Sequence, residues 1–334
     1  MSRTITSFDV ARLAGVSQAT VSRALRNLPN ISPATREKVA RAAAELNYVP
    51  HGSARSLSTR ITSRVAIVSE ELTNPFYPAL VEPLRQHLSD NGYRTMLVTD
   101  DEDDALTASN LTDGSCDGVI ITTAARNSRL PDALRAAGLP CVLVNRTTDS
   151  DRDVACQFAN AAGAGHVAEL LTELGHEHIG LINGPETIST SAERERGLKD
   201  ALEQAGRWLP SRLIRHGDFT AEAGRRGALD LLDAPVRPTA LVCGNDYIAI
   251  GALNAAKELG LSVPEDLTVI GFDDVAMASW ELIDLTTVHC DLSALAWDAV
   301  DSLLRLIGDR PADCLRVTAV DLVLRGTHAA PRRG

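Results

Sequence analysis

The sequence predicts an α/β protein with a three-helix head of helix-turn-helix type, a hinge, and two lobes built on doubly wound parallel sheets. The head is predicted by residues 9–25, DVARLAGVSQATVSRAL, which hold two short helical patterns joined by a tight turn. The lobes are predicted by short apolar runs that alternate with helical stretches and effectively form the same pattern twice. These runs are RVAIVS at 64, RTMLVT at 94, DGVIIT at 117, PCVLVN at 140, HIGLIN at 178, TALVCG at 239 and LTVIGF at 267. The alternation favours βαβ units, whose parallel sheets are covered on both faces.

The first two helices of the head follow from spacing and caps. Apolar residues recur at helical spacing in the first helix: Phe8, Val10, Ala11 and Ala14. Gly15 can adopt the positive φ that an abrupt helix end requires, and Ser17 stands where a cap of the second helix belongs. On a helical wheel the second helix has one apolar side, with Val21, Ala24 and Leu25. The opposite side holds Gln18, Ala19, Ser22, Arg23 and Arg26.

The third helix is expected after Ile31. Ser32 suits the cap and Pro33 the first turn, and an apolar stripe follows with Val39, Ala42, Ala43 and Leu46. In a helix-turn-helix of this size the second helix lies in the DNA major groove, where Gln pairs with adenine and Arg with guanine. The head is therefore expected to bind double-stranded DNA.

Charge is distributed unevenly along the chain. The whole protein has a formal net charge of -11, yet residues 1–60 hold nine Lys or Arg against three Asp or Glu. This basic head on an acidic body favours a polyanionic partner for the head alone. The alternative, that Gln18 and Arg23 are simply solvated helix residues, accounts for neither the local charge nor the tight turn.

Cysteine spacing and hydropathy predict a soluble cytoplasmic protein. The six cysteines lie far apart and form no CxxC, so we expect reduced thiols. The first ten residues lack the apolar stretch of a signal peptide, and no run approaches the roughly 20 apolar residues of a membrane span. No membrane partner is expected.

Motifs along the whole chain resemble the lactose-repressor (LacI/GalR) family of transcriptional regulators. The head and hinge carry TITSFDVARLAGVSQATVSRAL, ISPATREKVARAAAELNYVP and ARSL, and the body carries NPF, GP, ND, GFDD, LTTV and LVLRGT. The resemblance implies a sequence-specific repressor whose operator affinity is controlled by a small molecule held between two lobes of periplasmic-binding-protein type. It implies a homodimer on a pseudo-palindromic operator. No heptad repeat follows LVLRGT, so dimers are expected rather than tetramers.

The resemblance also divides the chain. The expected parts are a DNA-binding domain at 1–50, a hinge at 51–63 and an effector-binding and dimerisation domain at 64–334. Three crossings between lobes are implied, which place 64–159 and 291–319 in lobe one and 160–290 and 320–334 in lobe two.

The hinge sequence, PHGSARSLSTRITSR, has the composition of a linker. The resemblance implies that its ARSL segment becomes helical when two subunits meet on DNA, and that Leu57 enters the minor groove as an apolar wedge. The alternative is that Leu57 caps the body domain. The DNA-binding residues expected in head and hinge are Thr6, Ser17, Gln18, Ala19, Thr20, Ser22, Arg23, Asn30, Ala54, Arg55 and Leu57.

The effector site is expected at the carboxyl ends of the strands, in the cleft between the lobes. Residues there match family positions that face the effector: Asn74, Phe76, Asn145, Thr190, Arg194, Phe219, Asn245, Asp273 and Cys290. Arg146, beside Asn145, also matches such a position. Arg194 and Asp273 are the expected polar anchors, with Phe76 and Phe219 as stacking walls. Cys290 departs from the glutamine that family members often carry, and a thiol is a poor hydrogen-bond donor.

These side chains suit a sugar or a sugar phosphate, although a nucleobase or nucleoside acting as corepressor could use the same set. Taken singly, each could instead be a satisfied loop residue or part of a salt bridge between lobes. Whether the effector induces or corepresses stays open.

Rival classes find less support in the sequence. A solute-binding transport protein would need an export signal and no basic head, and a sugar-handling enzyme would show turnover. The sequence contains no GxSxG or HExxH motif. DDEDD at 100–104 lacks the glycine and spaced oxygens of a calcium loop, GHEHIG at 175–180 lacks a third ligand, and GAG at 163–165 is an incomplete dinucleotide fingerprint. We expect no enzyme activity, no cofactor and no metal.

Overall fold

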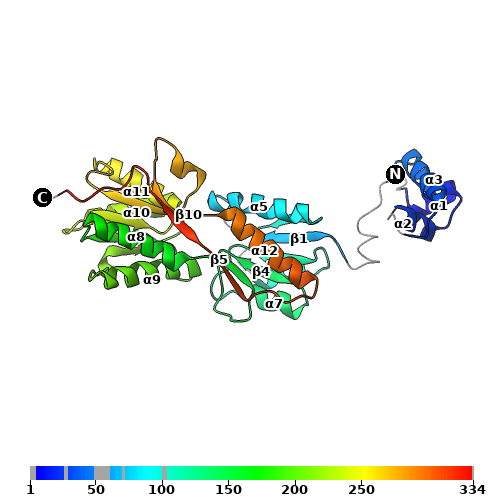
Figure 1. Cartoon of the computed structure of the whole chain (residues 1–334), viewed down its shortest axis with the longest axis horizontal. Coiled ribbons are helices and arrows are strands. Elements are labelled where there is room, and N and C mark those ends of the chain that lie inside the picture. Colours follow the sequence, from blue (N-terminus) through cyan, green and yellow to red (C-terminus); the bar gives the residue numbers. More distant parts are fainter. Residues whose placement is uncertain (1–4, 26–28, 49–60, 70–71, 100–103, 333–334) are drawn as a thin grey trace. The chain divides into compact units, whose positions relative to one another are not determined.

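The computed structural model describes residues 5–25, 29–48, 61–69, 72–99 and 104–332. The chain divides into two compact units, Met1–Thr62 and Ser63–Gly334 (Figure 1). Within the described ranges, no helix is both long enough and apolar enough to cross a lipid bilayer.

The first unit is the three-helix head. Its helices are α1 (Ser7–Ala14), α2 (Gln18–Leu25) and α3 (Pro33–Glu45). They pack around a small core that contains Val10, Ala11, Val21, Ala24, Val39, Ala42 and Ala43. The predicted caps are present: Gly15 ends α1 at a φ of 66°, the Ser17 hydroxyl accepts from the Thr20 amide at 3.1 Å, and the Ser32 hydroxyl accepts from the Thr35 amide at 3.1 Å.

One expectation for the head core was wrong. Phe8, predicted to lie on the apolar stripe of α1, is 66% exposed. At about 100° per residue, its position falls outside the arc that Val10, Ala11 and Ala14 share, so helical spacing alone did not place it in the core.

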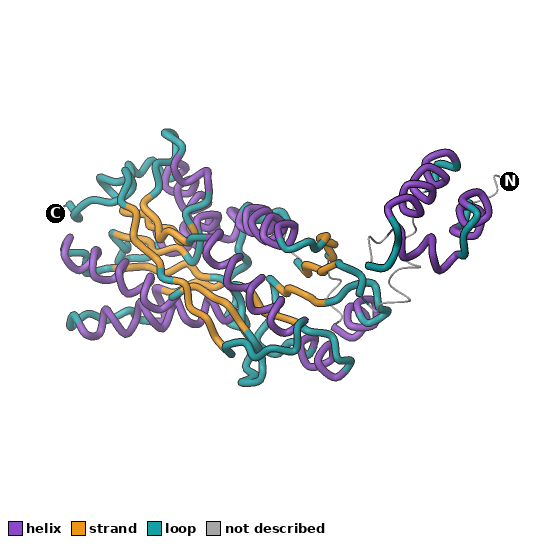
Figure 2. The backbone as a smooth tube through the Cα atoms, turned by 45° about the vertical axis from the view of Figure 1, so that its right-hand side comes forward, coloured by secondary structure: helices purple, strands orange, loops and turns teal. Residues whose placement is uncertain are grey.

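The second unit begins with a six-stranded sheet in the order β11-β5-β4-β3-β1-β2. Its strands are β1 (Arg64–Val68), β2 (Arg94–Val98), β3 (Gly118–Ile121), β4 (Cys141–Val144), β5 (Ala155–Phe158) and β11 (Leu315–Thr318). All of its pairings are parallel. Helices α5 (Phe76–Asp90) and α12 (Leu292–Ile307) pack against each other, and α6 (Asp104–Leu111) packs against α7 (Leu130–Ala136). Helices cover both faces of the strands in the tube view (Figure 2).

The second sheet has the order β12-β10-β9-β8-β6-β7. Its strands are β6 (Ile179–Asn183), β7 (Ile214–His216), β8 (Ala240–Cys243), β9 (Thr268–Asp273), β10 (Thr286–Cys290) and β12 (Val320–Val323). It is flanked by α8 (Asn160–Leu174), α9 (Ser189–Gln204), α10 (Ala221–Leu232) and α11 (Asp246–Glu258), with short 3-10 turns η1 (Ser211–Leu213) and η2 (Ala276–Ser279). The predicted α/β class with two doubly wound lobes is confirmed.

One strand departs from the all-parallel expectation, because β12 pairs antiparallel with β10. The chain leaves the second sheet through β10 and enters α12 beside the first sheet. It returns from β11 to β12 with only Ala319 between the two strands. Since β10 runs out of this lobe and β12 runs into it, the two strands point in opposite directions.

The strand β11 and the chain that follows β5 lie side by side where they pass between the sheets. The amide of Ala159 donates to the Thr318 carbonyl at 2.9 Å, so these passages are hydrogen-bonded to each other. The remaining passage joins β10 to α12, whose N-terminus is capped by Asp291.

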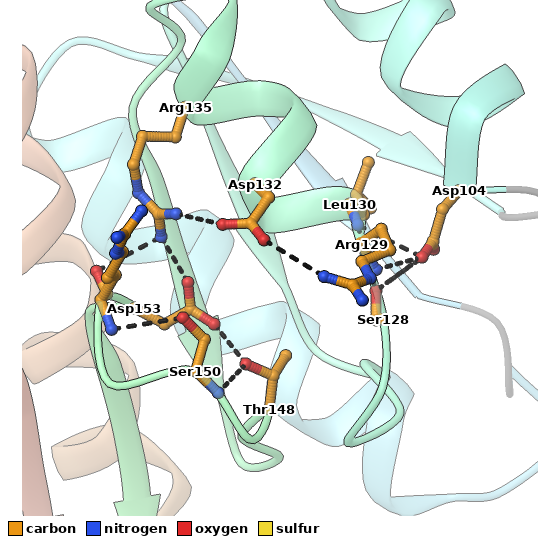
Figure 3. Close-up of polar contacts among 10 residues, drawn as sticks. Asp104, Ser128, Arg129, Leu130, Asp132, Arg135, Thr148, Ser150 and Asp153 are labelled. Atoms are coloured by element: carbon orange, nitrogen blue, oxygen red, sulfur yellow. Dashed lines mark hydrogen bonds and ion pairs between the residues drawn. The ribbon is translucent and has the colours of Figure 1, made fainter.

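A polar network fixes the loops that follow β3 and β4 (Figure 3). Asp104, at the start of α6, accepts hydrogen bonds from the Ser128 hydroxyl and from the amides of Arg129 and Leu130. In the same view, Asp153 accepts from Arg135 and Thr148. The β3 loop in turn contacts the second lobe, because the Arg126 amide donates to the Thr187 carbonyl at 3.1 Å. The cleft between the lobes is therefore bordered by loops with fixed hydrogen-bond partners.

Candidate functional site

The head presents part of its predicted DNA-binding set on the exposed side of α2. Gln18, Ala19 and Arg23 are exposed on this helix, whereas Thr20 and Ser22 are half-buried. Ser17, Thr6 and Asn30 are also exposed, and Asn30 has a φ of 71°. The remaining predicted residues, Ala54, Arg55 and Leu57, and also Arg26, lie outside the described residues.

Four of these side chains already have partners in the head, namely Thr6, Ser17, Gln18 and Thr20. The Thr6 hydroxyl donates to Asp9 at 2.8 Å and the Thr6 amide donates to the same carboxylate at 3.0 Å, so Thr6 holds the start of α1. The Ser17 hydroxyl caps α2 by accepting from the Thr20 amide at 3.1 Å, and it lies 2.9 Å from the Thr20 hydroxyl. The Gln18 side-chain amide donates to the Ser7 hydroxyl at 3.2 Å. Thr6 and Ser17 thus have a structural role whether or not they touch DNA.

In the body, eight of the nine predicted effector residues surround one cavity between the two lobes. The lining residues are Asn74, Phe76, Asn145, Thr190, Arg194, Phe219, Asn245 and Asp273, joined by Tyr77. The free space at their centre is about 10 Å³, room for about one water molecule. The ninth residue, Cys290, is 3% exposed at the end of β10 and is not among those that line the cavity.

The polar centre of the site is a buried ion pair between α9 and β9. The Nη2 atom of Arg194 lies 3.2 Å from Oδ1 of Asp273, and each side chain is 6% exposed. Arg194 also donates through Nε to Asn160 at 2.9 Å and through Nη1 to the carbonyl of Gly244. Its guanidinium carbon stands 3.7 Å from the centroid of the Phe272 ring. Each guanidinium nitrogen therefore has an acceptor, as a buried cation requires.

Burial controls the protonation of the Asp273 carboxyl. It raises the pKa of Asp273 to about 6, although the nearby guanidinium groups of Arg194 and Arg146 favour the charged form. Burial also raises the pKa of the Cys290 thiol, and the neighbouring Asp273 carboxylate adds to that effect. At neutral pH the site thus holds an ionised Asp273 and a neutral thiol.

The turn that carries Asp273 has a strained backbone, and a hydrogen bond to the buried Asp246 side chain holds it in place. Asp273 has a φ of 112° and Asp274 a φ of 55°, values that L-residues rarely adopt. Asp246 is fully buried beneath this turn and accepts from the Val275 amide at 2.8 Å and from the Thr287 hydroxyl at 2.5 Å. Burial raises the pKa of Asp246 well above its usual value. These contacts fix the direction of the Asp273 side chain.

One residue that lines the cavity, Tyr77, was not predicted, whereas Arg146 was expected at the end of its strand together with Asn145. Tyr77 lines the cavity beside Phe76. Arg146 is 2% exposed, and its guanidinium carbon lies 5.4 Å from the Tyr77 ring centroid and 5.6 Å from that of Phe219. Because Tyr77 belongs to the first lobe and Phe219 to the second, Arg146 contacts rings from both. Tyr77 directly follows the predicted Phe76, and that adjacency was the available signal.

A buried acceptor at the cavity lacks a hydrogen bond. The Oδ1 atom of Asn145, a residue with a φ of 70° at the end of β4, has no partner in the described part of the chain. Buried polar atoms are almost always paired in native proteins, so an isolated acceptor at a cavity indicates a place for a donor on a ligand.

The sequence matches two parts of one bacterial family. Residues 6–51 match the bacterial regulatory proteins of the lacI family, and residues 62–319 match the periplasmic binding proteins and sugar binding domain of the LacI family. The HTH-type transcriptional repressor CytR of Escherichia coli (strain K12) is 32% identical over 97% of this chain and 96% of its own length.

Two solved structures extend the similarity to the fold. A transcriptional regulator CelR–cellobiose complex has a TM-score of 0.75 at 31% identity, covering 97% of this chain and 99% of that one. A lac repressor dimer bound to operator and the anti-inducer ONPF has a TM-score of 0.89 at 28% identity, covering 98% of this chain and 100% of that one. The chain therefore belongs to the LacI family, and it is a DNA-binding transcriptional regulator, as its sequence predicted.

Proposed function

We propose that this regulator is a homodimeric repressor that binds a pseudo-palindromic operator. A sugar or sugar phosphate in the cleft lowers or raises its affinity for that operator. The observation that carries the effector class is the unpaired Asn145 acceptor beside the Arg194–Asp273 pair. Hydroxyl groups of a ligand can donate to Asn145 and to Asp273, and a ligand oxygen can accept from Arg194, which is the pattern that a polyol presents.

The aromatic lining adds support for a carbohydrate. Phe76, Tyr77 and Phe219 line the same cavity as these polar groups. Aromatic faces pack against the apolar face of a sugar ring while polar groups fix its hydroxyls. The CelR relative was solved as a complex with cellobiose.

A nucleobase or nucleoside is the second candidate. The observation that favours it is the position of the Arg146 guanidinium, 5.4 Å from the Tyr77 ring centroid and 5.6 Å from that of Phe219, because planar cationic and aromatic groups can stack on a base. A base would use the amides of Asn145 and Asn245 and would act as a corepressor.

The coupling to DNA follows from the closed cleft. About 10 Å³ of free space is too little for a monosaccharide, so binding requires that the lobes or the lining side chains move apart. The hinge, residues 51–63, leads directly into β1, so lobe movement changes the geometry from which the two hinges of a dimer extend. In this scheme only one arrangement of the lobes allows the two hinges to become ordered in the minor groove. Ala54, Arg55 and Leu57 then contact the DNA. Effector and operator then affect each other's affinity reciprocally.

The head supplies base recognition in this scheme. Gln18, Ala19 and Arg23 present the exposed side of α2 to the major groove, with Arg23 on a guanine. Flanking contacts come from Thr6, Ser17, Thr20, Ser22 and Asn30. Since the partner is chromosomal DNA, we place the protein in the cytoplasm, and we infer a binding function without catalytic turnover.

The direct test is a selection of bound sequences from random duplex DNA, repeated with sugars, sugar phosphates and nucleobases. We expect a two-fold symmetric site whose enrichment changes with one sugar or sugar phosphate. A response confined to nucleobases would select the second candidate. Enrichment of asymmetric or non-specific sequences under every condition would contradict a dimeric operator-binding repressor, and chemical conversion of a bound compound would contradict a purely binding function.

A further inference from the structure

A second pocket lies in the second lobe beside α9, and we call it the side pocket. Its inner wall is formed by Asn183, Glu186, Ser191, Glu195, Lys199 and His216. It has a free volume of about 300 Å³, against about 10 Å³ in the cleft. Small-molecule sites span roughly 300–1,000 Å³, so the side pocket reaches the size of a monosaccharide site.

The first turn of α9 separates the side pocket from the cleft. Thr190 lines the cleft, whereas the next residue, Ser191, lines the side pocket. On the sheet side, the Phe219 ring of the cleft packs on Gly184 so closely that a Cβ there would stand 2.2 Å from the ring. Gly184 directly follows Asn183, a wall residue of the side pocket. The two cavities therefore share a thin wall but no lining residue.

Ser191 supplies a buried polar atom that points to a ligand. Its side chain is 1% exposed, and among the described residues its hydroxyl has no hydrogen-bond partner. The neighbouring amide of Asn183 is engaged elsewhere, because it donates to the Ser191 carbonyl at 2.9 Å and accepts from the Gly184 amide at 2.9 Å. A hydroxyl that is buried at a pocket wall and unpaired is unfavourable unless a bound group pairs with it.

Most charged groups on the wall are paired, with one more carboxylate than cation: Glu186, Glu195 and Asp200 stand against Lys199 and Arg196. Glu195 lies 2.5 Å from the Lys199 ammonium and 2.9 Å from Nε2 of His216, while Nδ1 of His216 lies 3.3 Å from Glu186. Farther out, Arg196 and Asp200 are exposed and have opposite charge. A strongly charged ligand would therefore gain little net Coulomb energy, whereas donors and acceptors held in fixed positions suit a molecule that offers both.

From the pocket size, the unpaired Ser191 hydroxyl and the paired charges of the wall, we propose that the side pocket is a second ligand site for a neutral polyhydroxylated molecule of monosaccharide size. Ser191 exchanges a hydrogen bond with one ligand hydroxyl. Glu195 accepts from another hydroxyl, and Lys199 donates to a ligand oxygen. This site operates whether or not the cleft binds the effector proposed above.

The test disables ligand binding in the cleft by mutation and then measures ligand binding in the side pocket. The full chain with Arg194→Ala is titrated by calorimetry with D-glucose, D-ribose and cellobiose at millimolar concentrations. We expect one of these sugars to bind with a stoichiometry of one per protomer. Addition of Ser191→Ala should weaken that binding about tenfold, whereas Thr190→Ala, the adjacent residue on the cleft side, should leave it unchanged.

A second cleft variant and the wild-type protein serve as controls for this experiment. If Arg194→Ala fails to fold, Asn145→Leu takes its place, and the wild type gives an independent stoichiometry. Absence of binding by all three sugars to the cleft variant overturns the proposal, as does binding that Ser191→Ala leaves unchanged. If no sugar changes operator binding by the wild-type protein while the side pocket still binds a sugar, the proposed effector class is contradicted and the side-pocket proposal is retained.

Discussion

Arg194 and Asp273 form a buried ion pair in which the Nη2 and Oδ1 atoms lie 3.2 Å apart and each side chain is 6% exposed. The pair joins α9 to the end of β9, and its two residues are 79 positions apart in the sequence. Within the described part of the chain, Asp273 is the charged partner of Arg194, since the other acceptors are the side-chain oxygen of Asn160 and the Gly244 carbonyl. A neutral replacement at 273 therefore leaves a buried guanidinium without a counter-ion.

The first prediction concerns effector binding by Asp273→Asn. The asparagine keeps the size and one acceptor oxygen but removes the charge, so we expect effector affinity to fall by about 1.5–3 kcal/mol, a factor of roughly 10–150. Operator binding without effector should persist. Calorimetry with the effector found by selection measures the first quantity, and a gel-shift titration the second. Equal effector affinity in both proteins would remove Asp273 from the site.

The second prediction concerns stability and pH. The pKa of Asp273 is about 6 in the folded protein, above the usual value of 3.8, so the folded state binds the proton more tightly than the unfolded state does. Stability from this group is fully present below about pH 4 and is lost as pH rises through about 6. Two pKa units correspond to about 3 kcal/mol.

The comparison that isolates this effect is wild type against Asp273→Asn. Asp246 has a raised pKa as well, and in both proteins it changes the unfolding free energy with pH in the same direction. We expect the difference in unfolding free energy between the two proteins to change by up to about 3 kcal/mol between pH 4 and pH 7, in the direction that disfavours the wild type at pH 7. A difference that stays constant across this range would mean that Asp273 titrates near its ordinary pKa.

The third prediction concerns the close packing of α10 on α11. A Cβ on Gly251 would stand 1.9 Å from the Ala221 carbonyl oxygen, a backbone atom that cannot move aside alone. We expect Gly251→Ala to lower the free energy of unfolding by about 1–3 kcal/mol or more. Gly165 is the matched control, because its Cβ would meet only the Ala201 methyl at 3.9 Å. Gly165→Ala should stabilise α8 by up to about 1 kcal/mol. Urea unfolding of both variants measures the contrast, and equal effects would contradict it.

The sequence predicted most of the cleft because its residues follow buried strands at the same edge of each sheet. Arg194 and Asp273 were found in this way, although they are far apart in the chain. Tyr77 was missed because the sequence does not show that its ring reaches the cavity together with that of its neighbour Phe76. At Asn145 the backbone has a φ of 70°, and this conformation sets the direction of the chain that leads into Arg146.

Other features depended on tertiary structure that no local pattern carries. The strands β5 (ACQF) and β7 (IRH) lack a clear apolar run, because Gln157 interrupts the first and the second has one apolar residue, Ile214. The antiparallel pairing of β12 follows from the route of the chain between the lobes. Ser191 gave no signal in the sequence, since a serine in the first turn of a helix is ordinary and only its burial beside a pocket distinguishes it.

The fourth prediction concerns the hinge. Leu57 lies outside the described residues, and its expected role rests on the family resemblance and on the physics of minor-groove wedges. Leu57→Ala should weaken operator binding by about 1–3 kcal/mol without changing effector affinity, because only the wedge is shortened. A gel-shift titration and calorimetry check the two parts. Unchanged operator affinity would favour the alternative in which Leu57 caps the body domain.

The fifth prediction concerns base reading by Arg23, which is exposed on α2. An arginine that pairs with a guanine carries both affinity and sequence preference, whereas one that contacts phosphate carries affinity alone. We expect Arg23→Ala to weaken operator binding by about 1–3 kcal/mol and to relax one base position in each half-site. Selection from random duplex DNA with the variant measures the preference.

The control for Arg23 is Arg12 on α1, which forms an ion pair with Asp9 at 2.5 Å and has a side chain that is 70% exposed. Arg12→Ala removes an equal charge from the head, so it corrects for a general loss of electrostatic attraction to DNA. A loss in the Arg23 variant that is uniform across all sequences, with a salt slope reduced by about one, would reassign Arg23 to a phosphate. A relaxed position seen with Arg23→Ala and absent with Arg12→Ala would identify the base pair that α2 reads through Arg23.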